Sequence, residues 1–334
     1  MAAHRQISVA LQTDKRAAEY IALARLIDLY DFDVVSVYCD APYQPSYGPL
    51  LLMAPHLSRA RLGPAAVAPA RIHPIDIAAE AALLETLASG RTYIGLARGA
   101  WLEDHGIHEA ARPIRAMREA IEVIRYLLTG ATGGYDGEVY RLAPHVRATY
   151  PLPKRMPPLL IGSWGRQLCA LAGEFADEVK VGGSTNPDLA PVITAYVADG
   201  EHTAGRASGS VGMVFGAVTV VSDDRAAARK AARRSVALYL PVVAPLDPTI
   251  DVEPELVERL RAASNVGDLD GAAALISDDL LDRFAFSGNA DDLIRQAEAL
   301  FAAGVRRVEF GTPHGLVSER GIRIIGERVL PALR

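Results

Sequence analysis

One carboxylate, Asp40, stands directly after the apolar, strand-forming run VVSVYC. A carboxylate at the end of a buried strand can orient a substrate amine or a ring nitrogen, or it can take part in proton transfer. Aspartate also begins turns, and the segment DAPYQPSYGP that starts at Asp40 fits that alternative. We take Asp40 as the candidate catalytic residue, which also lies where a cofactor would bind.

Two glycine-rich segments, GSWGRQL and GGSTNP, each follow an apolar strand and open a helical stretch. Free backbone N–H groups at the positive end of a helix are a common phosphate-binding arrangement. An ordinary turn with a serine cap is the alternative for the first segment, and two neighbouring segments of this kind favour phosphate binding. The candidate residues in them are Gly162, Ser163, Trp164, Gly165, Gly182 and Gly183.

A third strand, RLGPAAVA, ends in small side chains, with Ala65 and Ala66 followed by Val67. Bulky side chains normally complete a core layer at such a position. Small ones indicate that a flat group approaches the backbone there. Ala97 and Gly99, at and just after the end of the next strand, are further cofactor-binding candidates.

Other polar residues that could have a functional role are also explained by an ordinary structural role. His105, His108 and Glu109 have a metal-like spacing, but an enzyme metal site usually draws ligands from several strand ends, so we expect a surface helix start and no metal site. His73 precedes a proline and is expected to cap a helix. No nucleophile elbow, Walker loop or zinc signature is present. A site with backbone donors and few acid–base groups suits a bound cofactor that carries the reaction.

The elements that must position these residues alternate between apolar strands and helices. Strands are expected at residues 7–12, 34–39, 61–68, 92–97, 157–163, 177–183, 211–221 and 306–312. Helices are expected at residues 16–30, 50–60, 74–88, 110–128, 167–173, 187–200, 224–240, 290–304 and 315–330. This alternation predicts a parallel α/β sheet, and about eight units is the number in a (β/α)8 TIM barrel. The alternative, an open doubly wound sheet, is less favoured because no GxGxxG motif follows the first strand.

Two segments interrupt the alternation. Residues 134–142, GYDGEVYRL, have the turn and alternation of a hairpin, and residues 241–282 form a helical insertion between the seventh and eighth strands. We expect a single domain over residues 1–334. In a TIM barrel the site lies at the carboxyl ends of the strands, where the candidate residues stand.

Composition narrows the class of partner. The chain has 334 residues, 50% of them hydrophobic, and a net charge of −5, which argues against nucleic acid or a membrane surface as a partner. Two cysteines, Cys39 and Cys169, form no disulfide framework and fit a reducing cytoplasm. The first residues are too polar for a signal peptide, and no run is long enough for a membrane span. We expect a cytoplasmic protein with a small-molecule substrate.

Several motifs resemble the bacterial luciferase-like superfamily. HPIDIAAEAALLETLASGRTYIGLARG and LIGSWGRQLCALAGEFADEVKVGG match its strand and helix passages, while LGPAAVAPARIHP and FAFSGNADDLIRQAEALFAAGVRRVEFGTPHG resemble the methylene-tetrahydromethanopterin reductase branch. The resemblance implies coenzyme F420, an 8-hydroxy-5-deazaflavin, a non-prolyl cis peptide at Ala65–Ala66 beneath its ring, and a homodimer. It also implies that residues 162–165 and 182–183 bind the phosphate side chain.

The chain departs from this pattern at two positions. Gln12 stands where similar reductases often carry a glutamate, and Asp40 is followed by Ala41 where several relatives have a histidine. We expect an oxidoreductase that transfers a hydride between F420 and an organic substrate. The alternatives are an FMN-dependent monooxygenase and a cofactor-binding member without activity.

Overall fold

Eight parallel strands form a barrel in the computed structural model, which describes residues 5–40 and 42–334. Neighbouring strands follow the order β3-β2-β1-β11-β9-β8-β7-β4, and backbone bridges Leu62–Thr92 and Val67–Leu96 join the two ends of this sheet. The barrel strands are β1 (Gln6–Leu11), β2 (Val34–Val37), β3 (Arg61–Pro64), β4 (Ile94–Ala97), β7 (Leu159–Gly162), β8 (Glu178–Gly182), β9 (Gly212–Val221) and β11 (Arg307–Gly315). The expected TIM barrel is confirmed.

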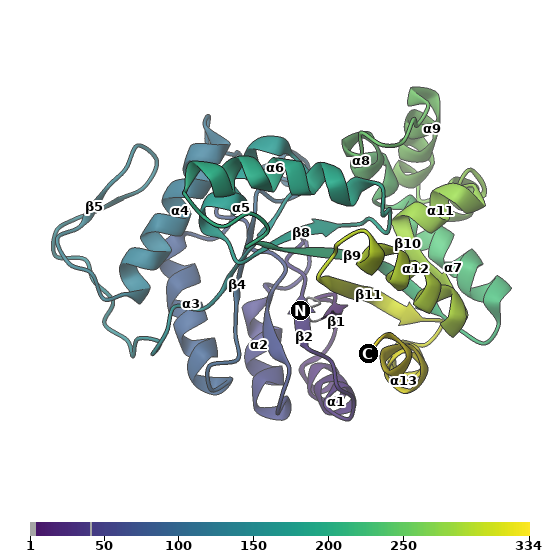
Figure 1. Cartoon of the computed structure of the whole chain (residues 1–334), viewed down its shortest axis with the longest axis horizontal. Helices are drawn as coiled ribbons and strands as arrows, with labels where there is room; N and C mark the ends of the chain where they lie inside the picture. Colours follow the sequence, from purple (N-terminus) through teal and green to yellow (C-terminus); the bar gives the residue numbers. More distant parts are fainter. Residues whose placement is uncertain (1–4, 41) are drawn as a thin grey trace.

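Helices surround the barrel, as Figure 1 shows for α1 to α6. They are α1 (Ala17–Ile27), α2 (Tyr47–Met53), α3 (Pro74–Leu87), α4 (Pro113–Leu128), α5 (Arg166–Phe175), α6 (Leu189–Thr203), α7 (Arg225–Ala237), α12 (Ala290–Ala302) and α13 (Ser318–Ile324). Prolines Pro74 and Pro113 stand at the first helical position, where a missing N–H costs nothing. Aliphatic side chains of strands and helices pack into one large buried cluster outside the barrel wall.

The short hairpin β5 (Tyr135–Asp136) and β6 (Arg141–Leu142) pairs antiparallel, as expected for residues 134–142. It extends from the end of the molecule opposite the helices α8 and α9 (Figure 1). Glu119 of α4, almost fully buried, accepts backbone hydrogen bonds from Glu138, Val139 and Tyr140 and so fixes the turn of this hairpin.

The segment between β9 and β11 contains more than the expected helices. It holds α8 (Leu240–Val243), α9 (Pro254–Asn265), α10 (Leu269–Ala274) and α11 (Asp278–Phe284), followed by a strand, β10 (Ala285–Gly288). The sequence analysis missed β10 because AFSG is too short to show alternation. β10 pairs with the second half of β9, from Ala285–Val218 to Gly288–Val221, above the part of β9 that pairs with β8.

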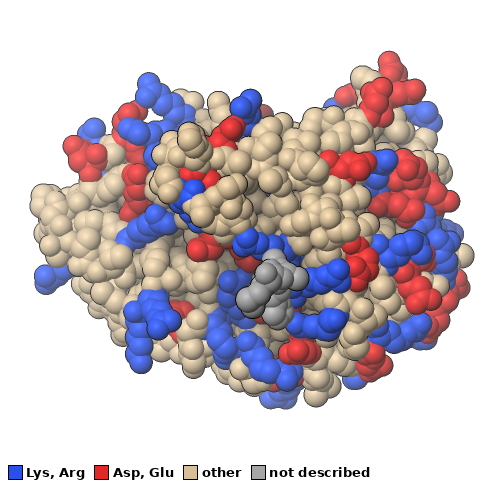
Figure 2. Space-filling view, in the orientation of Figure 1, with Lys and Arg blue, Asp and Glu red and all other residues tan. Residues whose placement is uncertain are grey.

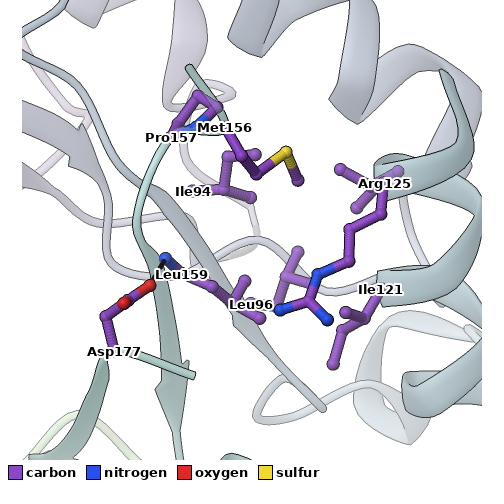
Figure 3. Close-up of a pocket in the computed structure, with 9 residues that line it drawn as sticks. Ile94, Leu96, Ile121, Arg125, Met156, Pro157, Leu159 and Asp177 are labelled. Carbon is purple, nitrogen blue, oxygen red and sulfur yellow. Dashed lines mark hydrogen bonds between the residues drawn. The ribbon is translucent and has the colours of Figure 1, made fainter. Parts of the chain in front are cut away.

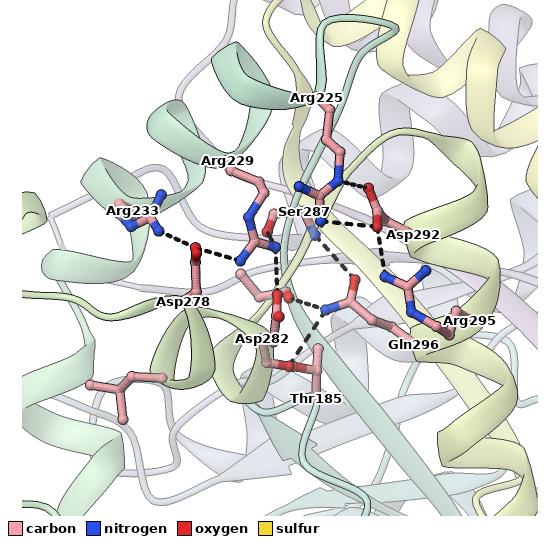
Figure 4. Close-up of polar contacts among 12 residues, drawn as sticks. Thr185, Arg225, Arg229, Arg233, Asp278, Asp282, Ser287, Asp292, Arg295 and Gln296 are labelled. Atoms are coloured by element: carbon pink, nitrogen blue, oxygen red, sulfur yellow. Dashed lines mark hydrogen bonds and ion pairs between the residues drawn. The ribbon is translucent and has the colours of Figure 1, made fainter.

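Ion pairs and hydrogen bonds fasten this segment to the barrel (Figure 4). Arg229 of α7 contacts Asp278 at 2.7 Å and Asp282 at 2.5 Å, and Thr185 Oγ1 donates to the Asp282 carbonyl at 2.8 Å. Acidic and basic side chains are interspersed over the end of the molecule that carries α7 and α11 (Figure 2). Its apolar residues form a second buried cluster with α7 and β10. That the whole chain is a single domain stays a prediction.

The last barrel strand also differs from the expectation. The strand expected over residues 306–312 continues to Gly315 as β11, whose register shifts between Gly311 and His314. The helix expected over residues 315–330 begins only at Ser318 and widens into a π-helical turn, Ile325–Val329, before α14 (Leu330–Leu333). This bulge brings the fully buried His314 into the barrel end.

Candidate functional site

Asp40 lies at the mouth of the barrel, where β1 and β2 end. Gln12 Nε2 donates a hydrogen bond to Asp40 Oδ2 at 3.3 Å, while Gln12 Oε1 accepts from the Thr13 N–H at 2.9 Å. Burial raises the pKa of Asp40 above its ordinary value, and this is opposed by the Gln12 hydrogen bond and by the charges of Lys180 and Arg71. Raising the pKa in this way favours the protonated form of the carboxyl group, which is the form that a proton donor requires. Ala41 lies outside the described residues.

Small side chains from three neighbouring strands form a floor beside Asp40. A Cβ atom placed on Gly162 of β7 would lie 3.3 Å from the Ala97 Cβ of β4 and 4.0 Å from the Ala66 Cβ beyond β3. The Ala65–Ala66 peptide bond is cis, as the family resemblance implies. Ala65, Ala66, Ala97 and Gly162 are all only partly buried, so this floor is open toward the mouth.

The residues around the floor hold it in place. Val67 is buried, and its backbone bonds to Gly95 and Ala97 across the strand junction that closes the barrel. Gly99 has a positive φ of 101°, and a Cβ there would lie 3.0 Å from the Ala68 Cβ. A side chain at Gly99 is therefore excluded both by its backbone conformation and by its neighbours.

The first glycine-rich segment opens α5. Ser163 Oγ accepts a hydrogen bond from the Gly165 N–H at 3.0 Å, and the Trp164 indole donates to the Gly182 carbonyl at 3.0 Å. Gly165 is the N-cap, so the N–H groups of the first turn of α5, from Arg166 onward, have no partner within the helix. This helix end is available to a phosphate group.

The second segment is less open than the pattern suggests. Gly182 is exposed and a Cβ there would meet nothing within 4 Å, but the Gly183 N–H donates to the Gly216 carbonyl at 2.6 Å. Asn186 is buried and donates to Asp247 Oδ2 at 2.9 Å, so the rest of the segment faces the insertion. Gly182 thus lies beside the first segment, while Gly183 supports β9.

Charged side chains fill the barrel interior below the mouth, and the sequence analysis did not find them. Lys180 of β8 and Glu309 of β11 form an ion pair, with side chains 6% and 0% exposed, and Ser36 of β2 donates to Glu309 at 2.5 Å. Because β2 and β8 are not neighbours in the sheet, these contacts cross the interior. Burial alone would raise the pKa of Glu309, but Lys180 and Arg307 hold it below its ordinary value.

A second charged layer lies deeper in the barrel. Arg307 and Arg61 both bind Glu178, at 2.7 and 2.9 Å, and both guanidinium groups face the Tyr93 ring. Tyr93 donates to the Gly63 carbonyl at 2.9 Å. The signal for these residues was available in the sequence as charges at alternate positions of β8 and β11, facing one side of each strand.

Two cavities lie near the barrel. One, of about 670 Å³, lies between the loop after β4 and the start of the helical insertion. Gly99, Trp101 and His108 line it on the loop side, and Leu238 and Arg261 line it on the other side. The other, of about 250 Å³, lies between α4 and the starts of β4 and β7 (Figure 3). It is at the opposite ends of the strands from Asp40 and the floor, so only the first cavity adjoins the candidate site.

The remaining candidates have structural contacts. His73 caps α3 by accepting the Ile75 N–H at 3.2 Å, as expected. Glu109 pairs with Arg98 at 2.5 Å, and the His105 ring nitrogen lies 2.6 Å from the Trp101 carbonyl. In residues 5–40 and 42–334 no three His, Cys, Asp or Glu side chains lie together as metal ligands would. Among the helices described, none is long and apolar enough to cross a membrane.

Comparison with known proteins places the barrel and its small-residue floor in one family. The luciferase-like monooxygenase family matches residues 1–307, and the chain belongs to this family. The chain is 31% identical over 298 residues to 5,10-methylenetetrahydromethanopterin reductase of Archaeoglobus fulgidus, covering 86% of this chain and 87% of the relative.

Coenzyme F420 appears in the names of two further proteins to which the chain is similar. The chain is 25% identical over 269 residues to F420-dependent glucose-6-phosphate dehydrogenase of Microbacterium testaceum, covering 79% and 75% of the two chains. Among solved structures, coenzyme F420 dependent tetrahydromethanopterin reductase from Methanopyrus kandleri aligns with a TM-score of 0.90 at 24% identity, over 99% of this chain and 100% of that chain. The barrel fold inferred from sequence is therefore confirmed.

Proposed function

We propose that this chain is an F420-dependent oxidoreductase that transfers a hydride between the deazaflavin and an organic substrate. The observation that carries the proposal is the floor of Ala66, Ala97 and Gly162 at the barrel mouth, where nothing larger than a methyl group projects. Similarity over most of the chain to a methylenetetrahydromethanopterin reductase supports the same activity and a substrate that resembles methylenetetrahydromethanopterin.

The residues present fit this coenzyme. The ring would rest on the floor, and the N-terminal turn of α5 with exposed Gly182 would bind the phosphate. When bound, the coenzyme supplies a ring carbon that gives or accepts the hydride. The 670 Å³ cavity beside Gly99 is large enough for an organic substrate next to the floor.

The chain's own residues then orient the reactants and manage a proton. Asp40, with its pKa raised by burial, holds a proton at the mouth, and Gln12 fixes the orientation of its carboxyl group. The closed barrel beneath the floor excludes water from one face of the ring, which strengthens electrostatic interactions there. The protein therefore contributes to the reaction mainly by orienting the coenzyme and the substrate and by excluding water.

Titration of the purified protein with oxidised F420 and, separately, with FMN tests the proposal. Binding is measured by equilibrium dialysis. We expect F420 to saturate the protein at a lower concentration than FMN does. Preferential binding of FMN, with oxygen consumption when reduced FMN is supplied, would instead indicate the monooxygenase alternative.

A cytoplasmic homodimer is also part of the proposal. Leu83 and Leu87 of α3 are 53% and 41% exposed, which supports a subunit contact through this helix. Sedimentation of the wild-type protein and of Leu83→Glu at equal concentration tests this contact, and a monomeric wild-type protein would refute it.

A further inference from the structure

The proposed reaction makes no use of the buried ion pair beneath the mouth. Lys180 and Glu309 meet across the barrel, and the Lys180 ammonium also lies 5.1 Å from the centre of the Tyr38 ring. A buried ion pair contributes little to stability compared with apolar residues of similar volume. Its presence just below the candidate site therefore calls for an explanation other than folding.

The position of Lys180 relates it directly to the floor. Lys180 pairs in register with Gly162 on the neighbouring strand, so both residues face the interior at the same level. Gly162 has no side chain to cover the lysine stem. The Tyr38 ring faces the ammonium, and the Tyr38 hydroxyl occupies space that a side chain at Gly311 would fill. The cation thus lies under the edge of the surface that would hold the ring.

The interior carries one more positive than negative side chain in the described residues below Asp40. Arg61, Arg307 and Lys180 are the cations, and Glu178 and Glu309 are the carboxylates. Arg61 and Arg307 share Glu178 in the deeper layer, and Lys180 is the cation nearest the mouth. Arg61 is 25% exposed, so the extra cation is the one in contact with solvent and the buried groups balance. Lys180 therefore acts through its position, as the cation of a buried pair that lies nearest to whatever binds at the mouth.

We propose that this buried charge selects the ionised form of the bound coenzyme: Lys180, held by Glu309, favours loss of the proton from the acidic hydroxyl on the deazaflavin ring. The inference rests on the proposed function, because it concerns the same site. The step is an acid–base equilibrium in which the ring O–H bond breaks, its electron pair stays on the ring oxygen, and the proton passes to solvent. An opposite charge nearby stabilises the anionic form of such a group.

Other charged groups face the same space and set the size of the effect. Asp40 at the end of β2 opposes ionisation of the ring when it is itself ionised, and Arg71, which donates to the Cys39 carbonyl at 2.6 Å, favours it. Tyr38 stays protonated, because burial raises its pKa well above the ordinary value and Glu309 and Asp40 add to the effect. Lys180 is the cation among these groups that approaches from below the floor.

The test measures the absorbance of bound F420 as a function of pH, because the ionised and neutral rings absorb differently. Lys180→Met is expected to reduce the acid dissociation constant of the bound hydroxyl about tenfold. Glu309→Gln, which leaves Lys180 unopposed, is expected to increase it. The double variant Lys180→Met with Glu309→Gln leaves no unpaired carboxylate. Its acid dissociation constant for the bound hydroxyl is expected to lie between those of Lys180→Met and the wild type. This variant replaces Lys180→Met in the test if the single variant does not fold.

Arg61→Met removes the same charge at the far end of the barrel and is the matched control, expected to leave the ionisation of the ring unchanged. Equal dissociation constants in the wild type, Lys180→Met and Glu309→Gln would overturn the inference, as would shifts of both variants in the same direction. A wild-type protein that binds no F420 would overturn the proposed function itself, and this outcome is distinguished by the absence of any binding in dialysis.

Discussion

Gln12 and Asp40 are joined side chain to side chain at the barrel mouth, with Gln12 Nε2 donating to Asp40 Oδ2 at 3.3 Å. The chain presents one carboxyl group here, where a glutamate at position 12, as the family resemblance implies for similar reductases, would place two together. The amide lowers the pKa of Asp40, whereas a second carboxylate would raise it. The contact therefore determines how readily Asp40 releases its proton.

Replacing Gln12 by leucine is expected to raise the pKa of Asp40 further, because the hydrogen bond that favours its ionised form is lost. A hydrogen bond of this kind contributes about 1 kcal/mol. The pH dependence of hydride transfer, followed by coenzyme absorbance, reports the shift. Gln44→Leu is the control, because Gln44 contacts Tyr20 and the Lys15 carbonyl and not Asp40. A profile unmoved by Gln12→Leu would remove Asp40 from the proton transfer.

Ala97→Leu is expected to weaken F420 binding by a factor of ten or more, about 1.4 kcal/mol, because the longer side chain would occupy the floor. Ala97 is only partly buried, so the folded state should be retained. Equilibrium dialysis measures the affinity and urea unfolding checks the stability. Ala100→Leu, on the exposed loop just beyond, is the matched control. Unchanged affinity in Ala97→Leu would place the ring elsewhere.

Because His314 is buried, we expect the free energy of unfolding to depend on pH. Burial lowers the pKa of His314 to about 4 from an ordinary value of 6.5. Between these values the unfolded chain binds a proton that the folded chain does not, so the free energy of unfolding falls as the pH drops from 6.5 toward 4. The loss from this group is roughly 2 kcal/mol between pH 7 and pH 5.

Urea unfolding of the wild type and His314→Asn at pH 7 and pH 5 tests this expectation. Asparagine tolerates the positive φ of 71° at this position and does not titrate. The variant should start less stable at pH 7 and lose about 2 kcal/mol less than the wild type on acidification. Equal losses in both proteins would mean that His314 is already charged or solvated in the fold.

Arg229 fastens the insertion to α7 and is expected to matter for stability. Its side chain is 8% exposed and contacts two carboxylates of α11. Arg229→Met should lower the free energy of unfolding by about 1–2 kcal/mol, because charge-assisted hydrogen bonds are lost while the aspartates stay hydrated. On the same helix, Arg234→Met removes a half-exposed partner of Asp270 and should cost less than about 0.5 kcal/mol. Thermal unfolding compares the two, and equal effects would contradict the anchoring role.

The architecture could be predicted because the alternation of apolar strands and amphipathic helices is a local property of the sequence. The eight barrel strands all lie where expected, within a few residues at their ends. β10 was missed because its four residues gain their strand conformation from pairing with Val218–Val221, a contact distant in sequence. The extension of β11 to Gly315 was missed for a related reason, since glycine and proline there predict a turn.

The site was predictable only where a residue type stands out at a strand end. Asp40, Ala66 and Gly162 were proposed in this way, and the structure places Ala66 and Gly162 close together, while their role in a site stays a prediction. Lys180 and Glu309 were not found, because each is a single charge inside an apolar strand and only the closed barrel shows that they meet. The hydrogen bond from the Gly183 N–H to Gly216 was not foreseen, since Gly216 lies on a strand whose register the sequence does not reveal, and phosphate binding at Gly183 stays a prediction.

The register between Ala285–Gly288 and Val218–Val221 has a consequence for how such a protein can diversify. It docks the insertion through main-chain bonds, which do not depend on which side chains α8, α9 and α10 present. Mutations in those helices can therefore change one wall of the 670 Å³ cavity while the small-residue floor on β3, β4 and β7 is left unchanged. Proteins with this fold can therefore change substrate specificity while keeping the same reaction.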